Sequence, residues 1–323
     1  MPFLPVGGQA VIEGVMMRAP SKIAVVVRRP DGSTAVMDRP FQSVTLRVKW
    51  LGLPVLRGAV SLFETMFLGL TALNFSADEA AREETTTAET PARDAKPASP
   101  SGGLSPLAQG LTVVVSLGVG VLLFVVLPAR VTPLIQHAAG LPGRYAFGLI
   151  DGALRLLAFV GYLSLIALWK DMARVLGYHG AEHKAIHAIE AGAPLTPESV
   201  QSFSRFHPRC GTTFLFLVVL VSIVVFTLIG RPDGIGQHLL RVACMPLIAG
   251  VAFEFIRLSG KYYGNAIVRS LTWPGMQFQR LTTREPDLEM CAIAIASLQR
   301  VLDDPTVVRL QGSGGSREVT FVQ

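Results

Sequence analysis

The sequence predicts a mainly α, polytopic membrane protein with about four transmembrane helices, a small N-terminal β module and a C-terminal helix. Half of the 323 residues are hydrophobic and only 16% are charged, whereas soluble domains carry about a quarter charged residues. Four long apolar runs between residues 107 and 258 are the second observation. The third is that strand-like sequence is concentrated before residue 50. Together they favour a membrane-inserted helical bundle with a small β module attached.

Residues 1–50 form the predicted β module. The segment AVIEGVMMR is apolar and β-branched, and KIAVVVRRPDGSTAVMDRP is typical of two strands. Asp31 and Gly32 lie between those strands and supply the positive φ that a tight hairpin turn needs. Glu13 is expected to face solvent or to pair with a base. The first residues lack a basic start followed by an apolar run, so we expect no cleavable signal peptide.

Two segments separate this module from the predicted spans. Residues 51–77 are apolar but contain Arg57 and Glu64. Two charges disfavour a free-standing span, so we expect an amphipathic helix that lies on the membrane or packs against the bundle. Residues 78–106 hold no large apolar side chain before Leu104. Such a segment cannot bury a core, and we expect a disordered linker.

The membrane domain is predicted over residues 107–258. Each apolar run is long enough to cross a bilayer. Asp151 and Arg155, spaced i,i+4, are expected to pair with each other near the start of the second span. The expected spans are 107–127, 147–168, 213–230 and 238–258.

Basic residues in the loops predict the orientation. The short third loop has only Arg231, whereas the loop 169–212 carries Lys170, Arg174, Lys184, Arg205 and Arg209. The positive-inside rule then places this histidine-rich loop and both termini in the cytoplasm, with the spans in the bacterial inner membrane.

Residues 259–303 are predicted to be a cytoplasmic tail ending in an amphipathic helix. Thr282 and Glu285 have capping-box spacing, and Pro286 would lie in the first turn. An apolar stripe follows, which favours a helix docked on the cytoplasmic face; a partner-binding helix is the alternative. Residues 304–323 are expected to be loosely ordered. The stripe is Leu288, Cys291, Ala292, Ile295, Leu298 and Leu302.

The strongest chemical signal is the segment YHGAEHKAIHAIE at residues 178–190. Its first part, from His179 to His183, has the form H-x-x-E-H, in which two histidines hold a metal and the glutamate activates water. On a helix ending near Gly192, the polar side chains would share roughly 140° of arc. We therefore predict His179 and His183 as metal ligands and Glu182 as the catalytic base. His187 or Glu190 would add a ligand or fix a ring. The alternative is a solvated or headgroup-facing polar stripe.

Two further places could complete that site. His207 and Cys210, three residues apart before the third span, could add ligands from the same membrane face. The alternative is a loop end with Thr212 or Thr213 capping the span. Glu254 lies about one turn inside the fourth span and could be a third ligand. Its alternative is an ion pair with Arg257 at i+3.

These residues indicate a divalent metal, with zinc as the expected ion, and metal-assisted hydrolysis of a peptide or lipid-linked substrate. The rival interpretation is a non-enzymatic accessory protein that docks a protein partner or anionic headgroups, for example in membrane-protein biogenesis. Transport is less well supported, because the charges within the spans cluster near their ends.

The net charge of +6 is scattered and does not form a nucleic-acid-binding stripe. Three cysteines without paired spacing favour a reducing compartment. The sequence leaves the oligomeric state open.

Five segments together resemble one family, the YqhQ-like bacterial membrane proteins. They are GGQAVIEGVMMR, YHGAEHKAIHAIE, HPRCGT, FEFIRLSGK and QRLTTREPDLEM. The resemblance covers nearly the whole chain apart from the linker and the last residues. It implies a multi-pass inner-membrane protein of unknown function with a predicted metal-dependent activity. The site residues carried over are His179, Glu182, His183, His187, His207, Cys210 and Glu254.

Overall fold

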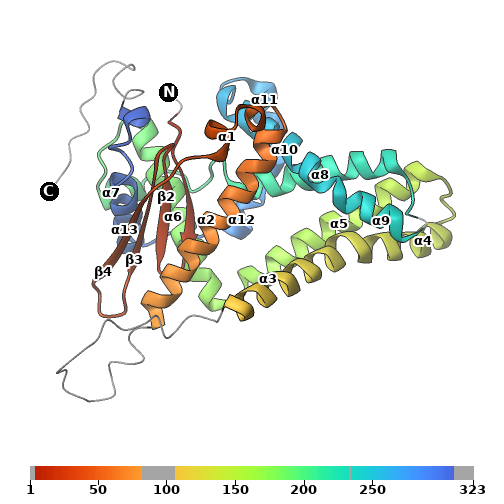
Figure 1. Ribbon diagram of the computed structural model, residues 1–323, viewed down its shortest axis with the longest axis horizontal. Helices are drawn as coiled ribbons and strands as arrows, with labels where there is room; N and C mark the ends of the chain where they lie inside the picture. The colour runs from red at the N-terminus through yellow and green to blue at the C-terminus, as the bar shows by residue number, and fades with distance from the viewer. Residues whose placement is uncertain (1–3, 82–105, 233, 309–323) are drawn as a thin grey trace, which may run out of the picture.

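The computed structural model describes residues 4–81, 106–232 and 234–308 (Figure 1). The predicted linker and the predicted loose C-terminal segment fall mostly outside these residues. The first linker residues, 78–81, are helical, and helix α3 begins at Pro106. The described chain is mostly helical, with one small sheet near its N-terminus.

Four consecutive antiparallel strands make up the sheet, in the order β1-β2-β3-β4. The predicted hairpin joins β3 to β4, and Gly32 in its turn has a φ of 82°. Glu13, between β1 and β2, also has a positive φ, of 51°, and pairs with Arg174. Pairing with a base was one of the two expectations for Glu13. The strands span Gly7–Val11, Gly14–Arg18, Lys22–Arg28 and Thr34–Pro40.

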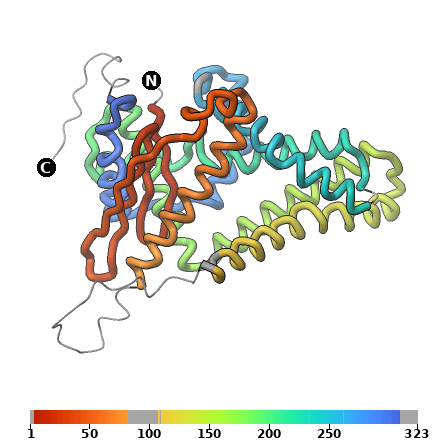
Figure 2. The backbone as a smooth tube through the Cα atoms, in the orientation of Figure 1, coloured from red at the N-terminus to blue at the C-terminus, as the bar shows by residue number. Residues whose placement is uncertain are grey.

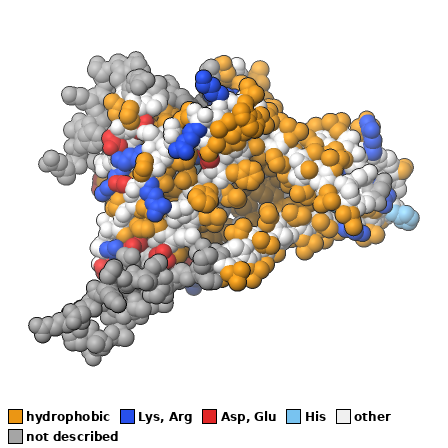
Figure 3. All heavy atoms as spheres, in the orientation of Figure 1, with side chains coloured by type: hydrophobic (Ala, Val, Ile, Leu, Met, Phe, Trp, Pro, Cys, Tyr) orange, Lys and Arg blue, Asp and Glu red, His pale blue; other side chains and the backbone are white. Residues whose placement is uncertain are grey.

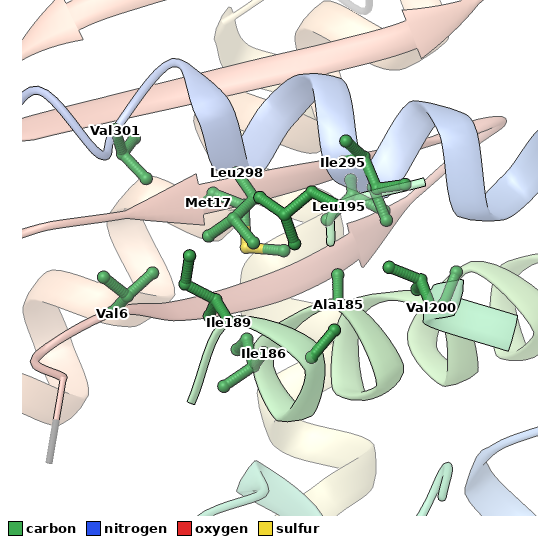
Figure 4. Packing of buried hydrophobic residues seen from close by; sticks show 14 of the residues in the cluster. Val6, Met17, Ala185, Ile186, Ile189, Leu195, Val200, Ile295, Leu298 and Val301 are labelled. Atoms are coloured by element: carbon green, nitrogen blue, oxygen red, sulfur yellow. The ribbon is translucent and has the colours of Figure 1, made fainter. Parts of the chain in front are cut away.

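Helices cover both faces of the sheet. Helices α6 (Lys170–Ala191) and α13 (Leu288–Gln299) pack on one face, together with the short α7 (Pro197–Gln201). Figure 4 shows their side chains meeting Met17 of β2 and Val6, which precedes β1, in a buried apolar core. Helix α2 (Leu56–Ala81) packs on the opposite face, where its Ala72 joins a second core. The N-terminal module is therefore not a separate unit, because its core is completed by segments from the middle and the end of the chain.

The remaining long helices extend away from the sheet as a bundle (Figures 1 and 2). Exposed apolar side chains cover much of its surface (Figure 3), which suits contact with lipid. The first long helix contains a π-helical segment, labelled η2. In chain order the bundle comprises α3 (Pro106–Val121), η2 (Leu122–Val126), α4 (Leu127–Ala139), α5 (Arg144–Ala167), α8 (Gly211–Ile229), α9 (Ile235–Ala243) and α10 (Met245–Lys261).

Five helical stretches in the described chain are long and apolar enough to cross a membrane, one more than the predicted four. The additional stretch is α2, because its charges are few relative to its 26 residues. Three of the other four agree with the predicted spans to within a few residues, whereas the first continues twelve residues beyond its predicted end at residue 127. They are 110–139, 144–167, 211–229 and 235–260.

Buried charges tie the bundle together at the π-helical segment. The predicted pair is confirmed: Arg155 Nε lies 2.9 Å from Asp151 Oδ2. Arg155 also donates to the carbonyl oxygens of Phe124 and Val125 in η2. Arg241, which is fully buried, lies 3.6 Å from Asp151. A π turn departs from regular α-helical hydrogen bonding, and two carbonyls of this turn accept from Arg155.

The last segments return the chain to the sheet. Two short elements precede α2, and two more lead to α13: α1 (Val44–Arg47), η1 (Lys49–Gly52), α11 (Ala266–Gln277) and α12 (Gln279–Thr282). The predicted capping box was wrong, because Asp287 caps α13 by accepting from the Met290 N–H. Arg284 N instead donates to Leu176 O, which holds the chain before α13 against α6. The predicted apolar stripe is largely buried against α6, β2 and β3.

A candidate metal centre at the junction of sheet and bundle

Helix α6 brings the sequence motif into the centre of the molecule. It ends as predicted, with Gly192 in the left-handed conformation at a φ of 66°. Gly180, inside the motif, faces the segment before α13, where an added Cβ would lie 2.1 Å from the Arg284 carbonyl oxygen. A glycine weakens a helix by about 1 kcal/mol relative to alanine. At position 180 the glycine lets the segment before α13 approach α6 closely, and Thr282 of this segment contacts His179.

His179, His183 and Cys210 form what we call the first group. Each offers one ligand atom, and these atoms all lie within 4.8 Å of one another. His179 Nε2 is 3.3 Å from Cys210 Sγ, and the two imidazole centroids are 4.5 Å apart. Cys210 reaches the group from the N-cap of α8, where its sulfur also accepts from the Thr212 N–H. Cys210 thus occupies the capping role that the sequence suggested for Thr212 or Thr213.

Backbone carbonyls fix both rings of the first group. His179 Nδ1 lies 2.7 Å from Thr282 O, and His183 Nδ1 lies 2.6 Å from Arg205 O. Because a carbonyl only accepts hydrogen bonds, each Nδ1 must carry the hydrogen. In the neutral ring the Nε2 lone pair is then available as a ligand. Metal-binding histidines in proteins are oriented in this way.

The charges of the first group favour a thiolate. Burial opposes ionisation of Cys210, but nearby His183 and His179 outweigh it and lower the pKa of the thiol well below its ordinary value. Burial likewise opposes the imidazolium of His179, yet the charge and hydrogen bond of Cys210 raise the pKa of that ring to about 9. The thiolate is the form of cysteine that binds metals.

Glu182 is buried beside this group. Its Oε2 lies 3.6 Å from His183 Nε2. Burial is the main cause that raises the pKa of the Glu182 carboxyl, while the charges of His183 and His179 act in the opposite direction. The backbone of Gly8 in β1 hydrogen-bonds the same carboxyl, and a Cβ on Gly8 would come within 2.6 Å of Glu182 Cγ. Strand β1 therefore approaches Glu182 more closely than a residue with a Cβ atom at position 8 would allow.

A cavity of about 480 Å³ opens onto Glu182 and all three residues of the first group. That volume lies within the usual range for small-molecule sites. Its other walls come from β1, β2, α2 and α10, so it lies where the sheet meets the bundle. The wall residues beyond the site include Gly8, Arg18, Ser61, Thr65 and Phe253.

His187, Glu190 and His207 form a second group farther along α6, with ligand atoms again within 4.8 Å of one another. The Arg209 guanidinium forms an ion pair with Glu190, and the Phe206 carbonyl accepts from His187 Nε2 at 2.9 Å. Burial is the main cause that lowers the pKa of His207 to about 4. Of the three residues only His207 lines the cavity. An arginine thus already supplies the positive charge beside the carboxylate of this group.

Glu254 lies in neither group. It accepts from Arg57 Nε at 2.7 Å and from the Val55 N–H at 3.3 Å. The sequence pointed to a ligand role or to a pair with Arg257, whereas the ion pair is with Arg57. The cause is the close packing of α2 on α10, where Gly58 and Gly250 let the two helices approach.

Sequence reasoning also missed the groups that position the first group. The Thr282 and Arg205 carbonyls are backbone atoms and carry no side-chain signal. Arg209 was counted only as a loop charge. Gly8 did have a signal, since glycine is unfavourable within a strand and often marks a close backbone approach.

A helical bundle with several apolar stretches, joined to a sheet, is compatible with a multi-pass membrane protein, and potential metal ligands lie on α6 and just before α8. Residues 53–304 match the family described as protein of unknown function (DUF1385), and the chain belongs to this family. It is 31% identical over 304 residues to the uncharacterized protein YqhQ of Bacillus subtilis (strain 168), covering 92% of each chain. No solved structure matches the chain. The resemblance to YqhQ-like proteins is confirmed, and the metal-dependent activity stays a prediction.

Proposed function

We propose that this protein is a metal-dependent hydrolase of the bacterial inner membrane, with its site at the cytoplasmic surface. His179, His183 and Cys210 hold one divalent metal, with zinc as the expected ion. The observation that carries the proposal is the arrangement of the first group. Two imidazoles have their Nδ1 atoms engaged by carbonyls, a thiolate lies within reach of Nε2, and all three border a cavity. Zinc accepts this nitrogen and sulfur donor set, and three protein ligands leave a position for substrate or water.

A zinc ion held there supplies Lewis acidity and lowers the pKa of water. Glu182 then serves as the general base. Its burial shifts the pKa of the carboxyl upward toward the working pH, which improves proton transfer. The Gly8 backbone holds the carboxyl in place, and α2 and α10 supply part of the cavity wall. Because both helices are apolar enough to span a membrane, we expect a substrate that is itself membrane-bound.

Metal analysis of the detergent-purified protein tests the ligand set. We expect about one zinc per chain in the wild type and little in His179→Ala or His183→Ala. If all three proteins contain the same amount of zinc, well below one ion per chain, the proposed metal site is wrong. A stoichiometric copurifying protein without metal would support the docking function instead.

A second variant separates binding from chemistry. Glu182→Gln should retain zinc, since the carboxylate is not among the three ligands, and should lose hydrolysis by at least about a hundredfold. The assay uses a panel of ester, amide and phosphodiester probes reconstituted in lipid vesicles. Loss of zinc from Glu182→Gln would make Glu182 a ligand rather than a base.

A further inference from the structure

The end of the bundle farthest from the sheet contains a cavity with basic walls. Helices α4 and α9 meet at this end (Figure 1). The cavity has a volume of about 390 Å³, and its lining includes Arg130, Arg231 and His238. No carboxylate among the described residues lines it. The Nδ1 atom of His238 is buried, and it has no hydrogen-bond partner in the part of the chain that the structure describes. Ile235, the first residue of α9, also borders the cavity, so the positive end of that helix dipole adds to the positive electrostatic potential in the cavity.

An apolar cavity continues from the basic one. Its volume is about 270 Å³, and it shares Arg130, Ile235 and His238 with the first. Only aliphatic side chains complete its wall, several of them from the π-helical segment η2. A molecule that fills both cavities must carry an anionic group at one end and an apolar chain at the other. The aliphatic lining is Val121, Val125, Val126, Leu239 and Val242.

The depth of the two cavities suits a lipid. At a rise of about 1.5 Å per residue, Arg130 lies roughly 36 Å from the start of α3 at Pro106. The hydrocarbon core of a bilayer is about 30 Å thick. Helix α8 ends at Ile229 after 19 residues, so Arg231 and His238 follow just beyond a span of similar length. In a bilayer crossed by this bundle, the basic cavity therefore lies at headgroup level and the apolar one lies in the hydrocarbon.

We propose that these cavities bind one anionic phospholipid. Its phosphate lies between Arg130 and His238, and one acyl chain runs along the η2 valines. The unpartnered His238 Nδ1 then gains a hydrogen bond to a phosphate oxygen. A soluble anion would satisfy the basic cavity but would leave the adjoining apolar one without a ligand. The site shares no residue with the first group, so the two proposals stand or fall separately.

Native mass spectrometry of the detergent-purified full chain tests the site. Phosphatidylglycerol and phosphatidylcholine of identical acyl chains are titrated in parallel. We expect phosphatidylglycerol to bind more tightly, and Arg130→Gln to weaken it about fivefold, since one basic residue near the membrane surface contributes on that order. Arg130→Lys keeps the charge and should keep the preference.

Arg144→Gln is the matched control. Arg144 begins α5, stacks on Tyr145 and lines neither cavity. Equal binding of the two lipids, or equal weakening by Arg144→Gln and Arg130→Gln, would overturn the proposal. Val242→Trp fills the apolar cavity and should also weaken phosphatidylglycerol. If instead inorganic phosphate competes fully and Val242→Trp has no effect, the site binds a soluble anion.

Discussion

The two polar groups each combine two side chains of α6 with one from the segment before α8, yet their surroundings differ. The first group has both imidazoles anchored through Nδ1 and borders the large cavity. The second group has its carboxylate paired with Arg209 and borders the cavity only through His207. Both groups therefore bring ligand-type side chains together, and only their surroundings tell them apart. What distinguishes the first group is the orientation of its rings and, among the described residues, the lack of an arginine or lysine paired with it.

The largest expected effect is a difference in zinc affinity between two single variants, one in each group. Cys210→Ala should lower zinc affinity by more than about a hundredfold, because it removes a direct ligand. His187→Ala should change it by no more than a few fold. Competition with a chromophoric chelator measures both. Similar losses in the two variants would mean that both groups hold the same metal.

A backbone change should affect the first group while sparing the second. Gly180→Ala places a methyl group 2.1 Å from the Arg284 carbonyl, close to the Thr282 carbonyl that anchors His179. Overpacking of this kind costs about 1–3 kcal/mol. The thermal unfolding midpoint in detergent should fall, together with the zinc content.

Gly161→Ala is the control for this change. Gly161 lies in helix α5, and no described atom beyond its neighbours and its own helix backbone lies within 4 Å of an added Cβ, so stability should stay equal or rise slightly. If Gly180→Ala behaves like Gly161→Ala, the close approach at Gly180 is unimportant.

A third experiment asks whether Arg209 is what excludes a metal from the second group. Arg209→Gln removes the cation paired with Glu190, so the carboxylate becomes available beside His187 and His207. At excess zinc we expect the stoichiometry to rise from about one toward two per chain. A stoichiometry that stays at one, in a protein that keeps its fold by circular dichroism, would show that ring orientation alone excludes the metal.

The smallest effect is spectroscopic and concerns the metal-free protein. Because the pKa of Cys210 is lowered well below its ordinary value, its thiolate should absorb in the ultraviolet already at neutral pH. As the pH falls through that lowered pKa the thiolate is protonated and the band disappears. His179→Ala should shift this loss to higher pH, since it removes the partner.

Cys291→Ser is the control for the thiolate band. Burial raises the pKa of Cys291 to about 11, so this thiol contributes no thiolate at neutral pH. The variant should therefore leave the band unchanged. If the band at neutral pH is lost in Cys291→Ser, the thiolate belongs to Cys291 and the assignment to Cys210 is wrong.

Local patterns predicted the elements that depend on nearby residues. The i,i+4 spacing of the histidines and the stop at Gly192 predicted α6, and Asp31-Gly32 predicted the β3–β4 hairpin. The same spacing rule predicted the Asp151–Arg155 pair. These features need only the chain within a few turns, so the sequence contains enough information for them.

Features that depend on distant packing were missed. Arg57 is 197 residues from Glu254, and only the packing of α2 on α10 brings them together. The division of the polar face into two groups depends on Arg209 and on two carbonyls from other segments. A helical projection shows which side chains share a face, but it cannot show what lies opposite that face.

The hydrogen bonds at Gly8 and Thr282 also set an order of events during biosynthesis. Glu182 is held by a residue near the start of the chain, and His179 by one that the ribosome adds a hundred residues after it. A nascent chain that has inserted its bundle but not released its last segment lacks the Thr282 anchor. The nascent protein consequently acquires this anchor of His179 only after residue 282 has left the ribosome.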